Sequence, residues 1–575
     1  MENDFFTRPF SLGNKQVQGR FVIPSGIRCT HASTIAKTFA EVAPIGVVTT
    51  KSISFAPRAG YREPIYARYA EGCYINAVGL ANPGAKKFLA EFDNIEIPSN
   101  KFLLVSIFGG GLEEFLAAAE TLSPIADGFE LNMSCPHAKG YGLQIGEDVE
   151  LVTAITRAVA AVKPVPVFVK LAAMMRGLPE TAQASMRAGA AGITVTNSIG
   201  PAMADVGEKP ILYNRVGGLS GDGIRPLGLR SVQQVRDAIG PDPIVIGMGG
   251  IGTAEHIAQY RKAGANLFGV GSTLTGMDSA AMRTYFERLQ DESQRELAPG
   301  EATSFPSITD MSYTASTLVS RDNISEGLYE IRLDTLGREY APGELAGRYF
   351  FLCVPGVGEK PFAILSAAAK TILIRTVGTF TAFLEKAPLG TRILLRGPYG
   401  APLPRFENRN LVLVGGGTGT ASLLEIAYAN RYANDVRFLL GARTRDGFFD
   451  LDDFREVGDV LLATDDGSEG YHGTVSDLLR HVMEAEAGWS RDRLEFVNCG
   501  PDGMVHSCIA IQREVAEPEH IWGSIEYMTS CGVGICGKCA SPSGSLTCID
   551  GPFVLCDEFT PRCGSAGCCH ETRTA

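Results

Sequence analysis

Short apolar runs, rich in β-branched and aromatic residues, alternate with helical patterns through the N-terminal half of the chain. Eight runs are expected to be strands: 21–26, 47–53, 102–109, 127–134, 167–173, 192–198, 243–250 and 267–273. Helical patterns fall between them at 113–121, 149–162, 179–188, 229–239 and 254–263. A doubly wound open sheet gives a similar alternation, but eight is the number that closes into a (β/α)8 TIM barrel. The sequence therefore predicts such a barrel over residues 1–295.

The rest of the chain changes character in steps, which predicts a multidomain protein of α/β and α+β class. Residues 296–306 are polar and proline-bearing, as in a linker. Short strands with Gly and Pro turns over 307–405 indicate an antiparallel β-barrel, and βα alternation over 406–522 indicates an α/β nucleotide domain. A cysteine-rich segment at 523–560 and a tail at 561–575 follow.

The composition of the chain argues against nucleic-acid and membrane partners. The net charge of −12 argues against a nucleic-acid partner, which needs a basic face. No apolar run approaches the roughly 20 residues of a membrane span, so no membrane partner is expected. The first residues, MENDFFTRPF, lack the layout of a signal peptide, and we expect a cytoplasmic protein.

Polar and glycine residues gather where the predicted barrel strands end, and the carboxyl ends of the strands are where barrel enzymes carry their chemistry. GMGG and GVGS end the last two strands and let backbone N–H groups approach a phosphate. The candidates at the strand ends are Ser25, Gly26, Lys51, Asn132, Cys135, Lys170, Asn197, Ser198, Gly249, Gly250, Gly271 and Ser272.

The residue types at these ends suggest a flavin and a cyclic amide. Lys51 and Lys170 need an anionic partner if they are buried, and a reduced flavin is anionic along one edge. Asn76, Asn132 and Asn197 offer the donor and acceptor pairs that match a cyclic imide or amide. A cysteine beside a proline, such as Cys135, is able to act as a nucleophile or a general base, although an inert core thiol is the plain alternative.

The barrel segment resembles the dihydroorotate dehydrogenase family, which binds FMN. The matching stretches, in order, are TTKSIS (49–54), YINAVGLANPG (74–84), ELNMSCPH (130–137), VFVKL (167–171), TVTNSIG (194–200), GGLSGDGIRPLGLR (217–230) and GMGGIGTAEH (247–256).

The resemblance implies a role for each matching residue. Cys135 would be the base that removes the C5 proton while the C6 hydride goes to FMN. Lys51 would contact both flavin and substrate, and Lys170 would stabilise the reduced flavin. The pyrimidine would be held by Lys51, Asn76, Asn132, Asn197 and Ser198. FMN would be held by Ser25, Gly26, Lys51, Lys170, Gly221, Gly249, Gly250, Gly271 and Ser272.

Two departures from the family leave the pyrimidine open. His137 stands where dihydroorotate dehydrogenases often have Asn, and Cys-Pro-His is also similar to dihydropyrimidine dehydrogenases. Ala172, Ala173 and Met174 replace the usual Ser-Pro-Asn. Oxidation of dihydroorotate to orotate is the leading hypothesis, with chemistry on uracil, thymine or a related cyclic amide as the alternative. Flavin barrels that reduce uridine in tRNA have a similar cysteine loop, but the negative net charge of this chain disfavours binding to RNA and therefore that activity.

Residues 307–560 resemble the electron-transfer subunit of NAD-linked dihydroorotate dehydrogenases, which is itself similar to ferredoxin reductases. The resemblance implies FAD at Lys360, Pro361 and Phe362, with Gly378 and Thr379 at its phosphates. The glycine-rich run Gly415, Gly416, Gly417, Thr418 and Gly419 would bind the nicotinamide nucleotide at a helix N-terminus. We expect NAD, and NADP stays open because Arg443 or Arg445 is able to accept a 2′-phosphate.

Eight of the 14 cysteines lie after residue 530. Cys531, Cys536, Cys539 and Cys548 form C-x4-C-x2-C-x8-C, the plant-type spacing of a [2Fe–2S] cluster. Zinc is the alternative, but zinc usually prefers paired C-x2-C knuckles. No role is assigned to the cysteines that follow, which are Cys556, Cys563, Cys568 and Cys569.

Together these segments predict a redox chain in one polypeptide. Electrons would pass from the pyrimidine to FMN, then through the [2Fe–2S] cluster and FAD to NAD. The expected partners are small molecules, and a homo-oligomer formed through the barrel is expected from the resemblance.

Overall fold

A computed structural model describes residues 4–134, 143–173, 175–295, 309–485, 490–525 and 527–559. The chain forms two compact units, each described by itself. The barrel unit comprises residues up to Thr309 together with Val533–Ser545, and the second unit comprises Asp310–Gly532 with Leu546–Thr560.

Eight parallel strands close into the barrel, which confirms the predicted fold. Their order around the barrel is β10 (Gly192–Val195), β15 (Ile244–Met248), β16 (Leu267–Gly269), β3 (Phe21–Ile23), β4 (Ile45–Thr49), β7 (Phe102–Ile107), β8 (Gly128–Asn132) and β9 (Val167–Leu171). Every residue of β7, β8 and β9 is buried. Such strands read as continuous apolar runs because side chains fill the inside and helices cover the outside.

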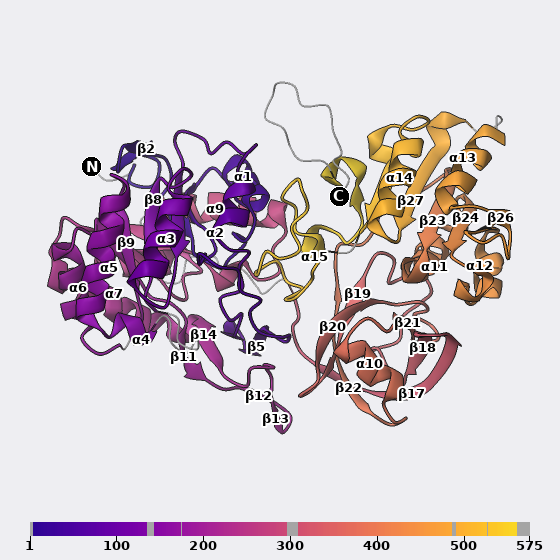
Figure 1. Cartoon of the computed structure of the whole chain (residues 1–575), viewed down its shortest axis with the longest axis horizontal. Helices are drawn as coiled ribbons and strands as arrows, with labels where there is room; N and C mark the ends of the chain where they lie inside the picture. The colour runs from indigo at the N-terminus through magenta and orange to yellow at the C-terminus, as the bar shows by residue number, and fades with distance from the viewer. Residues whose placement is uncertain are drawn as a thin grey trace. The chain divides into compact units, whose positions relative to one another are not determined.

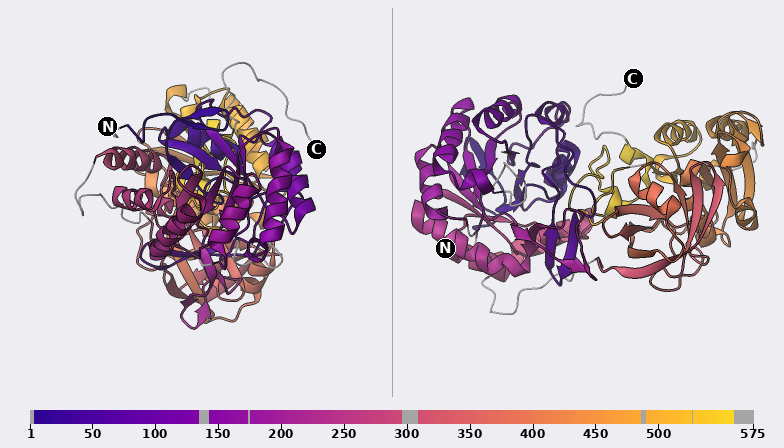
Figure 2. Two further views of the ribbon diagram at one scale, coloured as in Figure 1. Left: turned by 90° about the vertical axis from the view of Figure 1, so that its left-hand side faces the viewer. Right: turned by 60° about the horizontal axis from the view of Figure 1, so that its bottom comes forward.

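The helices lie around the outside of the barrel (Figure 1), and Figure 2 shows them from two further directions. They are α1 (Ala32–Glu41), α3 (Leu112–Leu122), α5 (Val149–Val162), α6 (Leu178–Arg187), α7 (Arg225–Ile239), α8 (Ala254–Ala263) and α9 (Ser279–Gln294), with the shorter α2 (Ala85–Ala90) and α4 (Leu143–Gly146). Asp148 accepts the Leu151 N–H at 3.0 Å and so starts α5, as a side-chain cap does.

Small antiparallel sheets extend the barrel unit. One sheet has the order β11 (Ile199–Ala202), β14 (Gly217–Gly221), β6 (Cys73–Asn76) and β5 (Tyr66–Ala70). Two-stranded pairs join β1 (Phe10–Leu12) to β2 (Lys15–Val17), and β12 (Asp205–Val206) to β13 (Lys209–Pro210). Because β11 follows β10 after a short turn, the four-stranded sheet begins at the carboxyl end of a barrel strand.

The second unit begins with an antiparallel sheet of six strands, which confirms the predicted antiparallel strands, although the described strands do not close into the predicted barrel. Its order is β20 (Gly358–Ala363), β19 (Tyr349–Val354), β22 (Arg392–Tyr399), β17 (Thr314–Ser325), β18 (Leu328–Leu333) and β21 (Thr371–Arg375). Helix α10 (Thr379–Lys386) packs against it.

A largely parallel sheet of seven strands completes the second unit, in agreement with the predicted βα alternation. Its order is β26 (Tyr471–His472), β25 (Asp459–Thr464), β24 (Asp435–Ala442), β23 (Asn410–Gly416), β27 (Leu494–Cys499), β28 (Ile521–Ser524) and β29 (Val554–Leu555). The helices between these strands are α11 (Ala421–Asn430), α12 (Leu451–Val457), α13 (Val475–Ala485) and α14 (Asp502–Gln512).

The predicted domain boundaries stay predictions. The linker at 296–306 and the tail at 561–575 lie outside the described residues. Within the cysteine-rich segment, Val533–Ser545 belongs to the barrel unit, and α15 (Thr547–Asp550) belongs to the second unit. None of the described helices is both long and apolar enough to cross a bilayer.

Candidate active site

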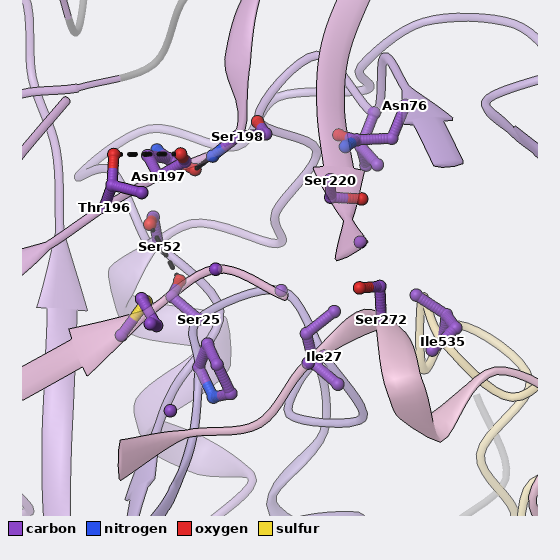
Figure 3. Close-up of a pocket in the computed structure, with 18 of the residues that line it drawn as sticks. Ser25, Ile27, Ser52, Asn76, Thr196, Asn197, Ser198, Ser220, Ser272 and Ile535 are labelled. Atoms are coloured by element: carbon purple, nitrogen blue, oxygen red, sulfur yellow. Dashed lines mark hydrogen bonds between the residues drawn. The ribbon is translucent and has the colours of Figure 1, made fainter. Parts of the chain in front are cut away.

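A pocket lies at the carboxyl ends of the barrel strands (Figure 3). The parallel strands bring their carboxyl ends to one face of the barrel, so residues far apart in sequence meet there. The predicted barrel residues that line it are Ser25, Gly26, Lys51, Asn76, Asn132, Lys170, Asn197, Ser198, Gly221, Gly249, Gly250, Gly271 and Ser272. Cys135 and His137 lie outside the described residues.

Two buried lysines give the pocket its positive charge. Lys51 is 9% exposed and Lys170 only 3%. The Lys170 ammonium lies 3.7 Å from Glu130 Oε1, and Glu130 is fully buried. Ammonium groups at the wall of a buried pocket favour an electron-rich or anionic ligand there. The phosphate of FMN and the electron-rich edge of a reduced flavin both fit this requirement.

The amide side chains are oriented by a network within the protein. Asn132 Nδ2 donates to Ser52 Oγ at 2.9 Å, and Asn132 Oδ1 accepts the Ser134 hydroxyl at 3.1 Å. Asn197 Nδ2 donates to Ser134 Oγ at 3.0 Å. Asn197 Oδ1 accepts the Ser198 N–H at 2.8 Å, a contact drawn in Figure 3. Because an amide has two donor hydrogens and two acceptor lone pairs, each Asn keeps capacity for a ligand.

Glycines at the pocket wall leave backbone peptide groups uncovered by side chains. Gly250 has φ +70°, and a Cβ there would lie 2.8 Å from Gly221 O and 2.9 Å from Arg225 Cβ. A Cβ on Gly221 would lie 2.0 Å from Gly72 O. Only glycine fits these positions, and the exposed peptide groups are of the kind that bind phosphate.

A second cysteine lies beside the pocket. The Gly26 N–H donates to Cys29 Sγ at 3.0 Å, and Cys29 is fully buried. Burial raises the pKa of Cys29 to about 11, and the Gly26 N–H and the positive charge of Lys51 offset this only in part. Cys29 therefore stays a thiol at neutral pH and is unsuited to act as a base.

The pocket also contains residues that the sequence analysis did not assign to it. Ser52 and Ser220 line it, and both lie inside the family-like motifs TTKSIS and GGLSGDG. Ile535 and Cys536 line it as well, and the sequence pattern predicts Cys536 only as a cluster ligand. Nothing in the local sequence links that loop to the barrel.

Main-chain contacts hold this loop against the barrel. The Thr30 hydroxyl donates to the carbonyl oxygen of Cys536 at 2.6 Å, and these residues are 506 positions apart. The Arg28 N–H donates to Ile535 O at 2.8 Å, and the Gly276 N–H donates to Val533 O at 2.9 Å. Cys536 is therefore fixed at the wall of the pocket.

The predicted FAD residues lie on neighbouring elements of the second unit. Lys360, Pro361 and Phe362 belong to β20, and the Phe362 ring lies 6.2 Å from that of Phe380 on α10. Gly378 and Thr379 stand at the start of α10, where no neighbouring atom lies within 4 Å of the position of a Gly378 Cβ.

The glycine run at 415–419 covers the end of β23 and the turn that leads to α11. A Cβ on Gly416 would lie 2.4 Å from Met504 Sδ, and one on Gly419 would lie 2.7 Å from Gly500 N. Gly417 has φ +57° and open space around its Cβ position. The turn after β23 therefore packs against the turn after β27, at the strand ends where nucleotides bind in such sheets.

The four cysteines of the predicted cluster are all buried. Cys531 and Cys548 belong to the second unit, and Cys536 and Cys539 to the barrel unit. Among the described residues, no three His, Cys, Asp or Glu side chains surround a point where one metal ion would fit. Thiolates are the ligands that iron–sulfur clusters use, and the [2Fe–2S] cluster stays a prediction from the cysteine spacing.

The match to a known protein family lies in the barrel region. Residues 10–292 match the dihydroorotate dehydrogenase family. The catalytic subunit of dihydroorotate dehydrogenase B (NAD(+)) from Pyrococcus abyssi is 41% identical over 232 residues, which are 40% of this chain and 75% of that protein. The same subunit from Thermococcus kodakarensis is 39% identical over 268 residues, covering 46% of this chain and 86% of that protein. A solved NADH-dependent reduced ferredoxin–NADP oxidoreductase aligns with 42% of this chain and 88% of its own, at 27% identity and a TM-score of 0.38, which is too low to establish a shared fold.

Proposed function

This chain belongs to the dihydroorotate dehydrogenase family and is an oxidoreductase acting on a CH–CH bond, and we propose that it oxidises dihydroorotate to orotate and passes the electrons to NAD. The observation that carries the proposal is the pocket itself. It combines the buried cations Lys51 and Lys170 with three asparagines, each oriented by a hydrogen bond within the protein, which suits a flavin beside a pyrimidine.

FMN is the proposed resident of the pocket. When bound, it supplies the acceptor for a hydride from the substrate. Lys170 is proposed to stabilise negative charge on it, and the glycines Gly249, Gly250 and Gly271 leave peptide groups free for its phosphate. The substrate is assigned to Asn76, Asn132, Asn197, Ser198 and Lys51.

Cys135 is the proposed base. The family resemblance supports it, and the state of Cys29, a thiol beside the pocket whose pKa is raised to about 11, argues against Cys29 in that role. A base that works near neutral pH needs a pKa close to the working pH, and Cys29 does not meet that condition.

The proposed exit for the electrons is the cysteine loop. Cys536 lies at the pocket wall, and the spacing of Cys531, Cys536, Cys539 and Cys548 supports a [2Fe–2S] cluster as the relay. FAD is proposed at Lys360–Phe362 with Gly378 and Thr379, and NAD at Gly415–Gly419. A one-electron relay between two-electron carriers explains why both units occur in one chain.

A second candidate function is reduction or oxidation of a pyrimidine that lacks the carboxylate, such as uracil or dihydrouracil. Only His137 favours it, through the Cys-Pro-His sequence. Assays of the full chain with dihydroorotate and with dihydrouracil, each with NAD, separate the two functions. A higher kcat/KM with dihydrouracil would replace the proposed substrate.

A further inference from the structure

A buried carboxylate lies below the pocket and has no role in the function proposed above. Glu130 is in the middle of β8 and is fully buried. Its Oε1 accepts the Ser106 hydroxyl at 3.0 Å and lies 3.7 Å from Lys170 Nζ. Within the described residues, Oε2 has no hydrogen-bond partner. A buried carboxylate is costly and needs such partners to persist.

Three hydroxyl groups join this carboxylate to the pocket. Ser106 Oγ lies 2.9 Å from Ser52 Oγ, and Ser52 Oγ lies 3.0 Å from Ser25 Oγ, a contact drawn in Figure 3. Ser25 and Ser52 line the pocket, whereas Ser106 is fully buried. The path therefore runs from the ligand space to Glu130 without a gap.

The carboxylate fixes the direction of every hydrogen bond in this path. Each hydroxyl has one proton, and Ser106 gives its proton to Glu130. Ser52 must then donate to Ser106, and Ser25 must donate to Ser52, which also accepts from Asn132 Nδ2 at 2.9 Å. Ser25 is left with lone pairs only, so it presents an acceptor to the pocket.

We propose that Glu130 is a positioning residue. Its carboxylate holds the Lys170 ammonium at the base of the pocket and, through Ser106 and Ser52, turns Ser25 into an acceptor for an N–H group of the ligand. This inference rests on the proposed function, because it takes the ligand to be FMN.

The charge of Glu130 has a measurable consequence. A negative charge 3.7 Å from the Lys170 ammonium offsets part of the positive field that favours an electron-rich ligand. Removing it stabilises reduced FMN relative to oxidised FMN. A purely structural role for Glu130 does not predict a change with this sign.

The test is the midpoint potential of FMN bound to the full-length holoprotein, in the wild type and in Glu130→Gln. Glutamine keeps the size and an acceptor for Ser106 and removes only the charge. We expect the ratio of reduced to oxidised FMN affinity to rise at least tenfold, which is about 30 mV for a two-electron couple. Ser106→Ala is the matched control, because it cuts the hydroxyl path and keeps the charge.

In Ser106→Ala we expect the ratio of reduced to oxidised FMN affinity to stay within threefold of the wild-type value. The Kd of FMN should rise at least fivefold. An unchanged or lower potential in Glu130→Gln, with FMN bound, overturns the charge role. If Glu130→Gln does not fold, an unchanged FMN Kd in Ser106→Ala overturns the hydroxyl path. Wild-type protein without FMN would instead refute the proposed function itself.

Discussion

Arg396 and Glu359 form a bidentate ion pair inside the second unit, with Nε–Oε1 at 2.8 Å and Nη2–Oε2 at 2.6 Å. Both side chains are almost fully buried, and the guanidinium also lies 4.0 Å from the centre of the Phe351 ring. The remaining nitrogen, Nη1, donates to the carbonyl oxygen of Cys531 at 2.9 Å. A buried charge pair therefore supports the first cysteine of the predicted cluster.

Removing one partner of this pair should strongly destabilise the second unit. Glu359→Gln leaves the Arg396 charge buried without its counter-charge, so we expect a loss of about 3–5 kcal/mol in the free energy of unfolding. The exposed pair Arg338–Glu344 gives the control, because solvent screens its charges and Glu344→Gln should change the free energy of unfolding far less. Urea unfolding followed by circular dichroism measures both, and equal losses in the two variants would refute this account of the buried pair.

Stability of the second unit should depend on pH through Glu330. Burial, followed by the neighbouring Asp450 and Asp322, raises the pKa of Glu330 from 4.5 to about 8. The folded state then holds more protons than the unfolded state between these values, so stability falls as pH rises from about 4.5 to about 8.

The Glu330→Gln variant should flatten this part of the pH profile and be more stable than wild type at pH 8 and above. Urea midpoints from pH 5 to pH 9 measure the slope. Glu326→Gln, at an exposed position on the same hairpin, should leave the slope as it is. Identical slopes in wild type and Glu330→Gln would contradict the assignment.

The barrel could be predicted because every strand carries its own signal. Runs such as Val167–Leu171 are mostly apolar, since both faces are covered, and a polar residue such as Lys170 stands near the end of the run. The position of Cys536 could not be predicted in this way. Its carbonyl oxygen is held by Thr30, 506 residues away, and no local pattern records so distant a hydrogen bond.

The hydroxyl path was missed for a different reason. Ser52, Ser106 and Glu130 lie on β-strands or just after them, where single polar residues look like turn or cap residues in the sequence. Only the parallel pairing of β7 with β8 places Ser106 beside Glu130 and gives the two a common role.

Glycine at position 250 should be essential for FMN. In Gly250→Ala the new methyl group meets Gly221 O and Arg225 at a backbone conformation with φ +70°, so the phosphate cradle must shift. We expect FMN affinity to fall at least tenfold, or about 1.4 kcal/mol. Gly207→Ala is the matched control, with φ +66° and no atom within 4 Å of its Cβ position. Fluorescence titration with FMN checks both variants. Equal FMN affinities in Gly250→Ala and Gly207→Ala would show that the FMN phosphate does not bind at Gly250.

Replacement of the proposed base should slow the chemical step while leaving the cofactor bound. Cys135→Ser substitutes a much weaker acid for the thiol, and loss of a general base costs about 10²–10⁴ in rate. Stopped-flow reduction of FMN by dihydroorotate at pH 7 measures this step. Cys508→Ala, a buried thiol of α14, should retain the wild-type rate. A wild-type rate in Cys135→Ser would remove Cys135 from the mechanism.

The most direct test of the central claim is anaerobic turnover of the purified full-length protein with dihydroorotate and NAD, with both products quantified in the same sample. We predict orotate and NADH in a one-to-one ratio, from protein that contains FMN, FAD and iron. Orotate formed without NADH, or no orotate from FMN-loaded protein, would contradict the account.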